Sequence, residues 1–329
     1  MVRNRILNDI EWDSFLKMNL NSSVFQTPGW AQYMMKSHKN YKALPFCFDF
    51  TDGTQILWSV LQQPYRKLFY RLEAMPFGLY GRPIINGIWS PEKGKEILHS
   101  ILSGRNIELT YSEYPFSESI DFELPVGVIQ KVKSVSTHIL CLTETWDEMF
   151  EVKFSSRIRN QVRRAKKEGL EVRTGVSAED IDNFYDLYKI STKKWGYKEP
   201  PYTKHFFSSI INCRLDFFKL LLVVDKGSII AGGIFIEDSD SVLYWFSAMD
   251  ESVEKKFPMY LLLSYAINEA ITKRKKYFNM GASGENEGVR RFKELWGATP
   301  IIYNQYIFKR DRVHKQIDRI SKVFNVIRN

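Results

Sequence analysis

The sequence predicts an α+β fold of two units with similar topology, each a mainly antiparallel, twisted sheet flanked by helices. Length is the first reason, because 329 residues exceed one ordinary domain core and suit two. The second is that short apolar alternations, typical of antiparallel strands, occur between stretches of helical periodicity in both halves. The third is that the second half repeats, more strictly, the order of these stretches in the first.

The first half begins with helices and continues mainly with strands. An amphipathic stretch predicts a helix over 11–20, and Pro28 is well placed to start a helix over 28–37. A Ser-Pro pair starts another helix over 90–103. Apolar alternation places the strands at 43–50, 55–62, 65–73, 107–111 and 128–132.

The second half contains an antiparallel meander between helices. Gly169 is expected to cap a basic helix over 155–168, and Lys226-Gly227 is a hairpin turn signal. Helical periodicity places further helices at 145–150, 179–195, 259–273, 289–295 and 312–327. Alternation places strands at 136–142, 170–176, 217–225, 228–237, 241–249, 277–280 and 300–308.

The excess positive charge lies in the second half. Residues 1–150 hold 15 basic and 16 acidic residues out of totals of 47 and 38. Residues 151–329 therefore hold 32 and 22, a net charge of +10. This positive charge produces an electrostatic field that attracts polyanions or anionic surfaces. A nucleotide, a tRNA or the inner face of a membrane is therefore an expected partner.

The cysteines and histidines argue against a disulfide framework and a metal site. Three cysteines are scattered without a CxxC pair, and five histidines are dispersed without an HxxxH pair. The N-terminal stretch carries acidic residues where a signal peptide needs an apolar run, and no window approaches 18 consecutive apolar residues. We expect a cytoplasmic protein with no bound metal or cofactor.

Three segments carry a resemblance to a known family. They are FNMGAS at 278–283 with NEGVRRFKELWGA at 286–298, the basic stretch SSRIRNQVRRAKKEGL at 155–170, and THILCL at 137–142. The first pair resembles the closing motif of the FemABX-like peptidyltransferases, which share their fold with the GNAT acyltransferases. FQTPGW at 25–30 is similar to a weaker mark of the same family.

The resemblance implies two tandem GNAT-like domains, here 1–134 and 135–329, and transfer of an acyl or aminoacyl group to an amine. It implies aminoacyl-tRNA or acyl-CoA as the donor. The acceptor would be a cell-envelope, peptidoglycan or polysaccharide precursor that is nucleotide- or lipid-linked. Family members that take a muropeptide nucleotide tend to have a lysine where this chain has Tyr33, and the coiled-coil insertion of some members has no counterpart here. Both departures weaken the peptidoglycan assignment.

Acyl transfer to an amine has three requirements. The donor carbonyl must be held close to the amine, the amine must lose a proton, and the oxyanion that forms must be stabilised. No Ser-His-Asp or Cys-His spacing is visible, so direct attack is expected in place of a covalent acyl-enzyme. Lys293 is the predicted charge-stabilising residue, against the alternative of a solvated surface lysine. Tyr244 is predicted to relay a proton or bind the acceptor, against the alternative of a core aromatic residue on a strand.

Substrate binding is assigned to residues of the basic helix and of the glycine turn. Arg159 and Arg163 fall on one helix face and suit phosphate oxygens, although a solvated face is the alternative. Asn279 and Ser283 border the turn at Gly281, where they either orient substrate or satisfy the backbone. Arg291 is the remaining predicted substrate-binding residue. We expect the turn and the basic helix to face each other across a groove.

Two alternatives to an aminoacyl transferase stay open. The segment 250–258 lacks a Gly-x-Gly turn and is acidic, which argues against acetyl-CoA, yet an acyl-CoA-dependent N-acyltransferase is a second enzyme hypothesis. A binding module for tRNA or anionic lipid is the non-enzyme hypothesis. The tail over 309–329 is basic and amphipathic, so it either docks on its domain or contacts an anionic membrane. The oligomeric state is not predicted.

Overall fold

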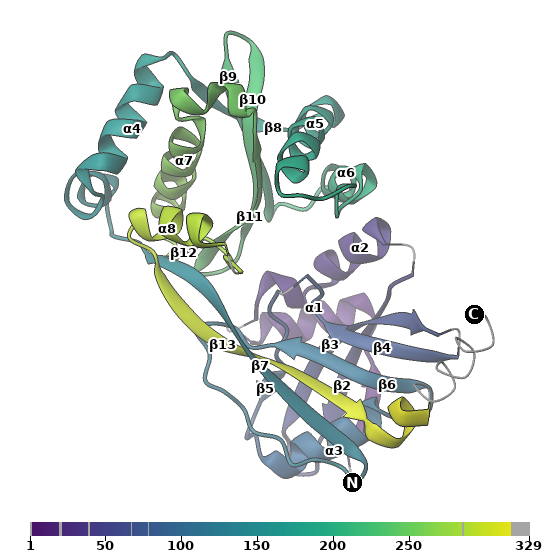
Figure 1. Ribbon diagram of the computed structural model, residues 1–329. Helices are drawn as coiled ribbons and strands as arrows, with labels where there is room; N and C mark the ends of the chain where they lie inside the picture. The colour runs from purple at the N-terminus through teal and green to yellow at the C-terminus, as the bar shows by residue number, and fades with distance from the viewer. Residues whose placement is uncertain are drawn as a thin grey trace. The chain divides into compact units, whose positions relative to one another are not determined.

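A computed structural model describes residues 2–19, 22–38, 40–66, 68–77, 79–284 and 286–316 (Figure 1). The chain divides into two compact units. The first comprises Met1–Val135 and Ile302–Asn329, and the second Ser136–Ile301. This division differs from the two sequence-predicted domains in one respect, because the chain after Ile301 belongs with the first unit.

The sheet of the first unit combines an antiparallel meander with one parallel pair. Its strands are β1 (Arg3–Ile6), β2 (Lys42–Asp49), β3 (Gln55–Tyr65), β4 (Phe69–Ala74), β5 (Ile84–Asn86), β6 (Asn106–Ser112) and β13 (Thr299–Arg310). The order is β1-β2-β3-β4-β6-β13, with β5 beside β3. Among the strand pairs described for this unit, β4 and β6 alone are parallel, because helix α3 (Pro91–Ile101) lies between them in the chain. The last strand, β13, runs antiparallel to β6.

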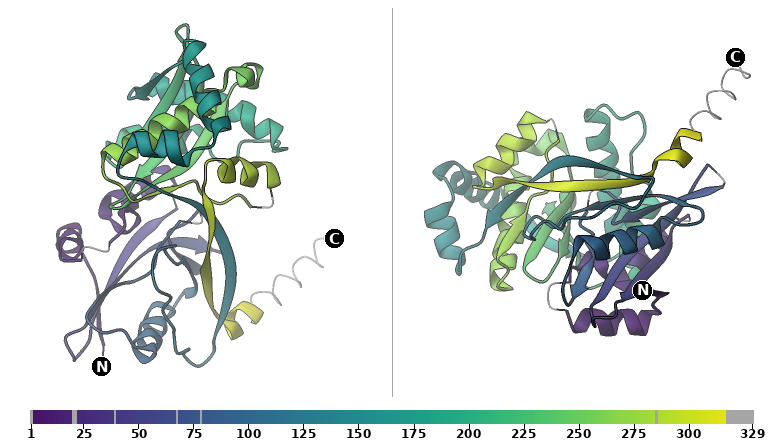
Figure 2. Two further views of the ribbon diagram at one scale, coloured as in Figure 1. Left: turned by 90° about the vertical axis from the view of Figure 1, so that its left-hand side faces the viewer. Right: turned by 90° about the horizontal axis from the view of Figure 1, so that it is seen from below.

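The core of the first unit lies between this sheet and α3. Ile97, Leu98 and Ile101 of the helix belong to one buried cluster with Trp58 of β3 and Phe308 of β13. Helices α1 (Asp9–Lys17) and α2 (Pro28–Ser37) also belong to this unit, together with the short turn η1 (Val24–Gln26). The two longest described strands, β13 and β7 (Val128–Cys141), are neighbours in the strand order (Figure 2).

The second unit repeats this plan. Its strands are the end of β7, β8 (Glu171–Gly175), β9 (Phe218–Asp225), β10 (Ser228–Glu237), β11 (Ser241–Met249) and β12 (Tyr277–Asn279). The order is β7-β12-β11-β10-β9-β8. Only β11 and β12 are parallel, and helix α7 (Pro258–Thr272) is the crossover between them. The end of β7 then pairs antiparallel with β12, as β13 does with β6 in the first unit.

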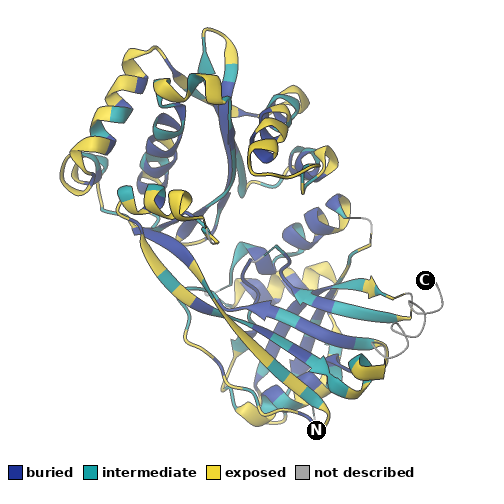
Figure 3. Ribbon diagram, in the orientation of Figure 1, coloured by how far each residue is buried: buried dark blue, intermediate teal, exposed yellow. Residues whose placement is uncertain are grey.

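Helices cover both faces of the second sheet (Figures 1 and 3). Leu221 and Val223 of β9 join the buried cluster of α7 and the basic helix α4 (Ser156–Lys167). On the opposite face, Phe184 of α5 (Ala178–Lys194) approaches Gly232 of β10. The other elements of the unit are η2 (Glu148–Lys153), α6 (Lys204–Cys213), η3 (Glu251–Lys256) and α8 (Glu287–Leu295).

The prediction of an α+β fold, with mainly antiparallel strands and flanking helices in each unit, is confirmed, although the strands of both units follow one another in a single continuous order. Several element predictions need correction. The strands expected at 128–132 and 136–142 are one strand, β7, and the helix at 145–150 is a π-helical turn, η2. Helix α6 is absent from the sequence prediction, although Thr203 caps it.

The predicted terminal helix is only partly within the described residues. Residues 311–316 are helical, and 317–327 lie outside the described part of the chain.

Candidate active site

The glycine turn of the sequence motif follows β12. Gly281 has φ +76°, a left-handed conformation that glycine adopts without strain, and a Cβ there would lie 3.3 Å from the Tyr244 carbonyl oxygen. Asn279 is buried, and its Oδ1 accepts hydrogen bonds from the Gly281 backbone N–H at 2.9 Å and from the Thr137 hydroxyl at 2.6 Å. Asn279 therefore fixes the turn against β7.

Lys293 is buried beneath this turn. It lies near the end of α8, whose first turn is capped by Asn286, and only 5% of its surface is exposed. Its ammonium donates hydrogen bonds to the carbonyl oxygens of Gly281 at 2.8 Å and Ala282 at 2.7 Å. An ammonium has three donors, and the described residues account for two. Burial lowers the pKa of Lys293 to about 8.

His138 is a member of this cluster that the sequence analysis did not single out. It lies on β7 beside Thr137 and is buried. Its Nδ1 lies 3.2 Å from the Ser283 hydroxyl oxygen, and its Nε2 lies 4.0 Å from a carboxylate oxygen of Glu294. The available signal was a polar Thr-His pair that directly precedes the apolar run of a strand. Pairing of β7 with β12 brings that pair to the turn.

Tyr244 packs in the core of the second unit. Its ring stacks on Phe235 with centroids 5.3 Å apart, and it contacts the buried cluster of that unit. Burial raises the pKa of its phenol well above the ordinary value. The hydroxyl therefore stays protonated at neutral pH and can act as a donor.

Arg159 and Arg163 are engaged with the π-helical turn η2. Arg159 donates to the carbonyl oxygens of Glu151 at 2.9 Å and Phe154 at 2.6 Å. Arg163 forms a two-pronged ion pair with the Glu151 carboxylate at 2.9 and 3.2 Å, and its guanidinium lies 5.5 Å from the Phe150 ring centroid. A phosphate at either arginine would have to compete with the Glu151 carboxylate.

The motif segments meet through aromatic packing. Phe154, directly before α4, packs edge-on against Trp296, directly after α8, with centroids 5.1 Å apart. The expected groove between the basic helix and the turn stays a prediction. Arg291, the remaining predicted site residue, is exposed on α8 and pairs with Glu287 at 3.3 Å.

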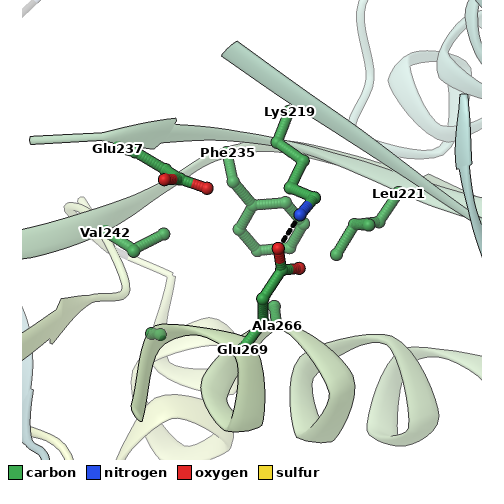
Figure 4. A pocket seen from close by; sticks show the side chains of 8 residues that line it. Lys219, Leu221, Phe235, Glu237, Val242, Ala266 and Glu269 are labelled. Atoms are coloured by element: carbon green, nitrogen blue, oxygen red, sulfur yellow. Dashed lines mark ion pairs between the residues drawn. The ribbon is translucent and has the colours of Figure 1, made fainter. Parts of the chain in front are cut away.

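A pocket of the second unit lies elsewhere, between α7 and the strands β9 to β11 (Figure 4). Leu221, Phe235 and Val242 form its apolar part, and Lys219 pairs with Glu269 across it. The third charged residue of the lining, Glu237, pairs with Lys273 of the segment after α7. Each charged group that lines the pocket therefore already has an ion-pair partner.

Two kinds of feature are missing from the described ranges. No group of three or more potential metal ligands occurs there. No described helix combines the length and the apolar character that crossing a lipid bilayer requires.

Comparisons with known proteins agree with this architecture. Residues 152–294 match the family model described as an acetyltransferase (GNAT) domain. The crystal structure of FemX is similar with a TM-score of 0.65 and 15% identity, over 92% of this chain and 96% of that one. The C-terminal domain of a putative lysylphosphatidylglycerol synthetase from Agrobacterium fabrum is similar with a TM-score of 0.54 and 11% identity, over 91% of both chains.

A tandem GNAT protein from the clavulanic acid biosynthesis pathway has a TM-score of 0.50 and 7% identity, over 94% of this chain and 98% of that one. A search of curated proteins gave no match. The match to the acetyltransferase (GNAT) domain lies within 152–294, and the fold of the chain is similar to that of FemX. The chain is therefore a tandem GNAT-fold protein that resembles the FemABX-like group of the GNAT superfamily.

Proposed function

We propose that this protein transfers an acyl or aminoacyl group to an amine by direct attack, with Lys293 as the charge-stabilising group. The observation that supports this most is the buried ammonium held by two carbonyl oxygens of the glycine turn. A buried positive charge interacts with a developing oxyanion more strongly than an exposed one, because little water screens it. A purely solvated lysine would have no such environment.

The other members of the site have supporting roles in the proposal. Asn279 keeps the turn in shape, and Ser283, a partly exposed residue, lies next to it. Arg159, Arg163 and Arg291 would meet phosphate groups of a substrate. Arg291 is the most accessible of the three, with 77% of its side chain exposed. Tyr244 would contribute only its backbone carbonyl next to Gly281, because its ring stacks on Phe235.

Aminoacyl-tRNA is the donor that we favour. In the second unit α7 begins at Pro258 after the turn η3, whose residues include Glu251 and Glu254. Carboxylates at that position oppose a pyrophosphate, and no glycine-rich stretch offers backbone N–H groups there. The match of 152–294 to an acetyltransferase domain favours the second candidate, an acyl-CoA donor.

The proposed acceptor is an amine on a cell-envelope, peptidoglycan or polysaccharide precursor, nucleotide- or lipid-linked. Its support is the resemblance to the FemABX-like group and the net charge of +10 on 151–329. A lipid-linked acceptor would bring the protein to an anionic membrane surface, where the basic half would be attracted. The fully buried Tyr33, at the position where nucleotide-binding members tend to have lysine, does not favour a nucleotide-linked acceptor.

A donor-depletion assay tests the proposal. The protein is incubated with total tRNA charged with labelled amino acids, or with a panel of acyl-CoAs, each with a mixture of amino acids, amino sugars and polyamines as amines. We expect loss of label from the charged tRNA, dependent on Lys293. Loss from an acyl-CoA alone would favour the second candidate.

If the protein is instead a non-catalytic binding module for tRNA or anionic lipid, we expect the opposite result. Lys293→Met would then leave biological function intact, and charge reversal at Arg164 and Lys167 of α4 would abolish it. Binding of uncharged tRNA and of anionic vesicles by each variant separates the two cases.

A further inference from the structure

His138 is placed to serve the reaction without contacting the substrate itself. The residue is 2% exposed, so a substrate amine cannot reach its ring. Ser283 is partly exposed at the end of the glycine turn, and its hydroxyl oxygen lies 3.2 Å from His138 Nδ1. Any action of the imidazole on a substrate therefore passes through the Ser283 hydroxyl.

The surroundings of the ring select its tautomer. His138 Nε2 has no hydrogen-bond partner among the described residues and lies 4.0 Å from the Glu294 carboxylate. A lone pair at Nε2 would be repelled by that negative charge, so the hydrogen of the neutral ring belongs on Nε2. Nδ1 then carries the lone pair and accepts the hydrogen bond of the Ser283 hydroxyl.

We propose that Ser283 and His138 form a proton relay that deprotonates the attacking amine, with Glu294 stabilising the imidazolium. This inference rests on the proposed acyl transfer. The Ser283 hydroxyl contacts the amine, and His138 acts through it. Glu294 is a positioning residue, because its carboxylate selects the tautomer and then faces the charged ring.

The relay conserves atoms and charge. The amine nitrogen forms a bond to the donor carbonyl carbon and gives a proton to Ser283 Oγ, while the Ser283 proton moves to His138 Nδ1. The tetrahedral intermediate then collapses with cleavage of the bond to the donor oxygen or sulfur. The proton returns along the same route to that leaving atom, so the enzyme ends as it began.

Burial and the charges around His138 keep its ring neutral before the reaction. Burial, followed by the Lys293 ammonium and Arg290, lowers the pKa of His138, while Glu294 opposes them. The ring is therefore neutral at pH 7. A base contributes on the order of 10²–10⁴-fold to such a step.

The first test needs no substrate. With ¹⁵N-labelled histidine, the spectrum of the full chain has signals from five residues, and His138→Asn identifies that of His138. We expect a neutral ring with hydrogen on Nε2 at pH 7. Hydrogen on Nδ1, or a charged ring at that pH, would overturn the relay.

The second test separates a proton acceptor from a merely structural contact. Asparagine places an oxygen where Nδ1 lies, so His138→Asn preserves the acceptor for Ser283 but cannot take up a proton. We expect about 10²-fold slower transfer from charged total tRNA, the same loss in Ser283→Ala, and no further loss in the double variant. The low-pH limb of the wild-type rate profile is expected to vanish in His138→Asn.

The chain offers a matched control in the first unit. Ser37 Oγ lies 3.0 Å from His38 Nδ1, and Ser37→Ala is expected to leave the rate unchanged. A full rate in His138→Asn, with folding verified by thermal melting, would overturn the relay alone. Acylation of Ser283 by the donor, detected by mass spectrometry, would also overturn it. Absence of transfer by wild type with every donor would overturn the proposed function and the relay together.

Discussion

At the scale of single residues, the site is organised by burial of polar groups. Lys293, Asn279 and His138 are each nearly inaccessible, and each has partners on the turn that follows β12. A buried ammonium costs free energy unless hydrogen bonds compensate it, and the carbonyl oxygens of Gly281 and Ala282 provide such bonds to Lys293.

The charge of Lys293 predicts a pH dependence of activity. Because its pKa is about 8, the ammonium loses its proton as the pH rises through that value, and we expect the transfer rate to fall. Lys293→Met should lower the rate by about 10²–10³-fold at pH 7, as removal of one oxyanion-stabilising donor does. Rate profiles from pH 6 to 9.5 check this. A rate that instead rises through pH 8 would identify Lys293 as a base.

The lowered pKa of Lys293 also predicts that the stability of the protein depends on pH. A lysine has an ordinary pKa of about 10.4, so between roughly pH 8 and pH 10.4 the unfolded chain binds a proton that the folded chain does not. The contribution of Lys293 to the free energy of unfolding therefore increases with pH across that window, by on the order of 2–3 kcal/mol. Urea unfolding at pH 7.5 and 9.5 measures the increase, and Lys293→Met should remove it. An equal increase in the variant would contradict the assignment.

At the scale of elements, local hydrogen bonds fix where the helices begin. Helix α5 starts with a capping box in which Ser177 and Asp180 exchange side-chain to backbone hydrogen bonds. The buried Asp180 carboxylate also accepts from the Val176 N–H at 2.9 Å and from Arg173. This arrangement attaches the helix to the end of β8.

Asp180→Asn is expected to destabilise the second unit by about 1–3 kcal/mol, because a charged acceptor of several hydrogen bonds is lost. The Arg173 hydrogen bond, followed by the backbone donors, lowers the pKa of Asp180. Its stabilisation is therefore present above about pH 4 and is lost as the pH falls through the folded-state pKa. Urea unfolding followed by circular dichroism measures both effects.

The same helix provides the control. Asp182 forms an exposed ion pair with Lys204, so Asp182→Asn should change stability by less than about 0.5 kcal/mol. Equal effects of the two substitutions would show that the capping box does not carry the stabilisation.

At the scale of the whole molecule, the two units are built on one plan but closed by strands from distant parts of the sequence. Each sheet has an antiparallel meander, one helix crossover to a parallel strand, and one closing antiparallel strand. The closing strand of the first unit is β13, which follows the second unit in the chain, and that of the second is β7. The sheet of the first unit therefore acquires β13 only after the second unit has been synthesised.

Substitution of Phe308 on β13 tests whether this strand stabilises the first unit. It is fully buried in the core of the first unit, and Phe308→Ala should cost about 3–5 kcal/mol. The loss of amide hydrogen-exchange protection is expected in β6 and its neighbours. Ile302→Ala, on the same strand with 73% of the residue exposed, should change stability by less than about 0.5 kcal/mol. If amide hydrogen-exchange protection were lost only in the second unit, the claim that β13 stabilises the sheet of the first unit would be contradicted.

Features that depend on residues close together in the chain were predictable from the amino-acid sequence. Periodicity identified the basic helix and the crossover helix of the second unit, the Lys226-Gly227 hairpin, and the position of Lys293 on a short helix after a glycine turn. Three features required the folded chain: β13 pairs with β6, Lys293 is buried, and His138 contacts Ser283, 145 residues away in the sequence. The physical reason is that strand pairing and burial arise from contacts distant in sequence, which local periodicity does not encode.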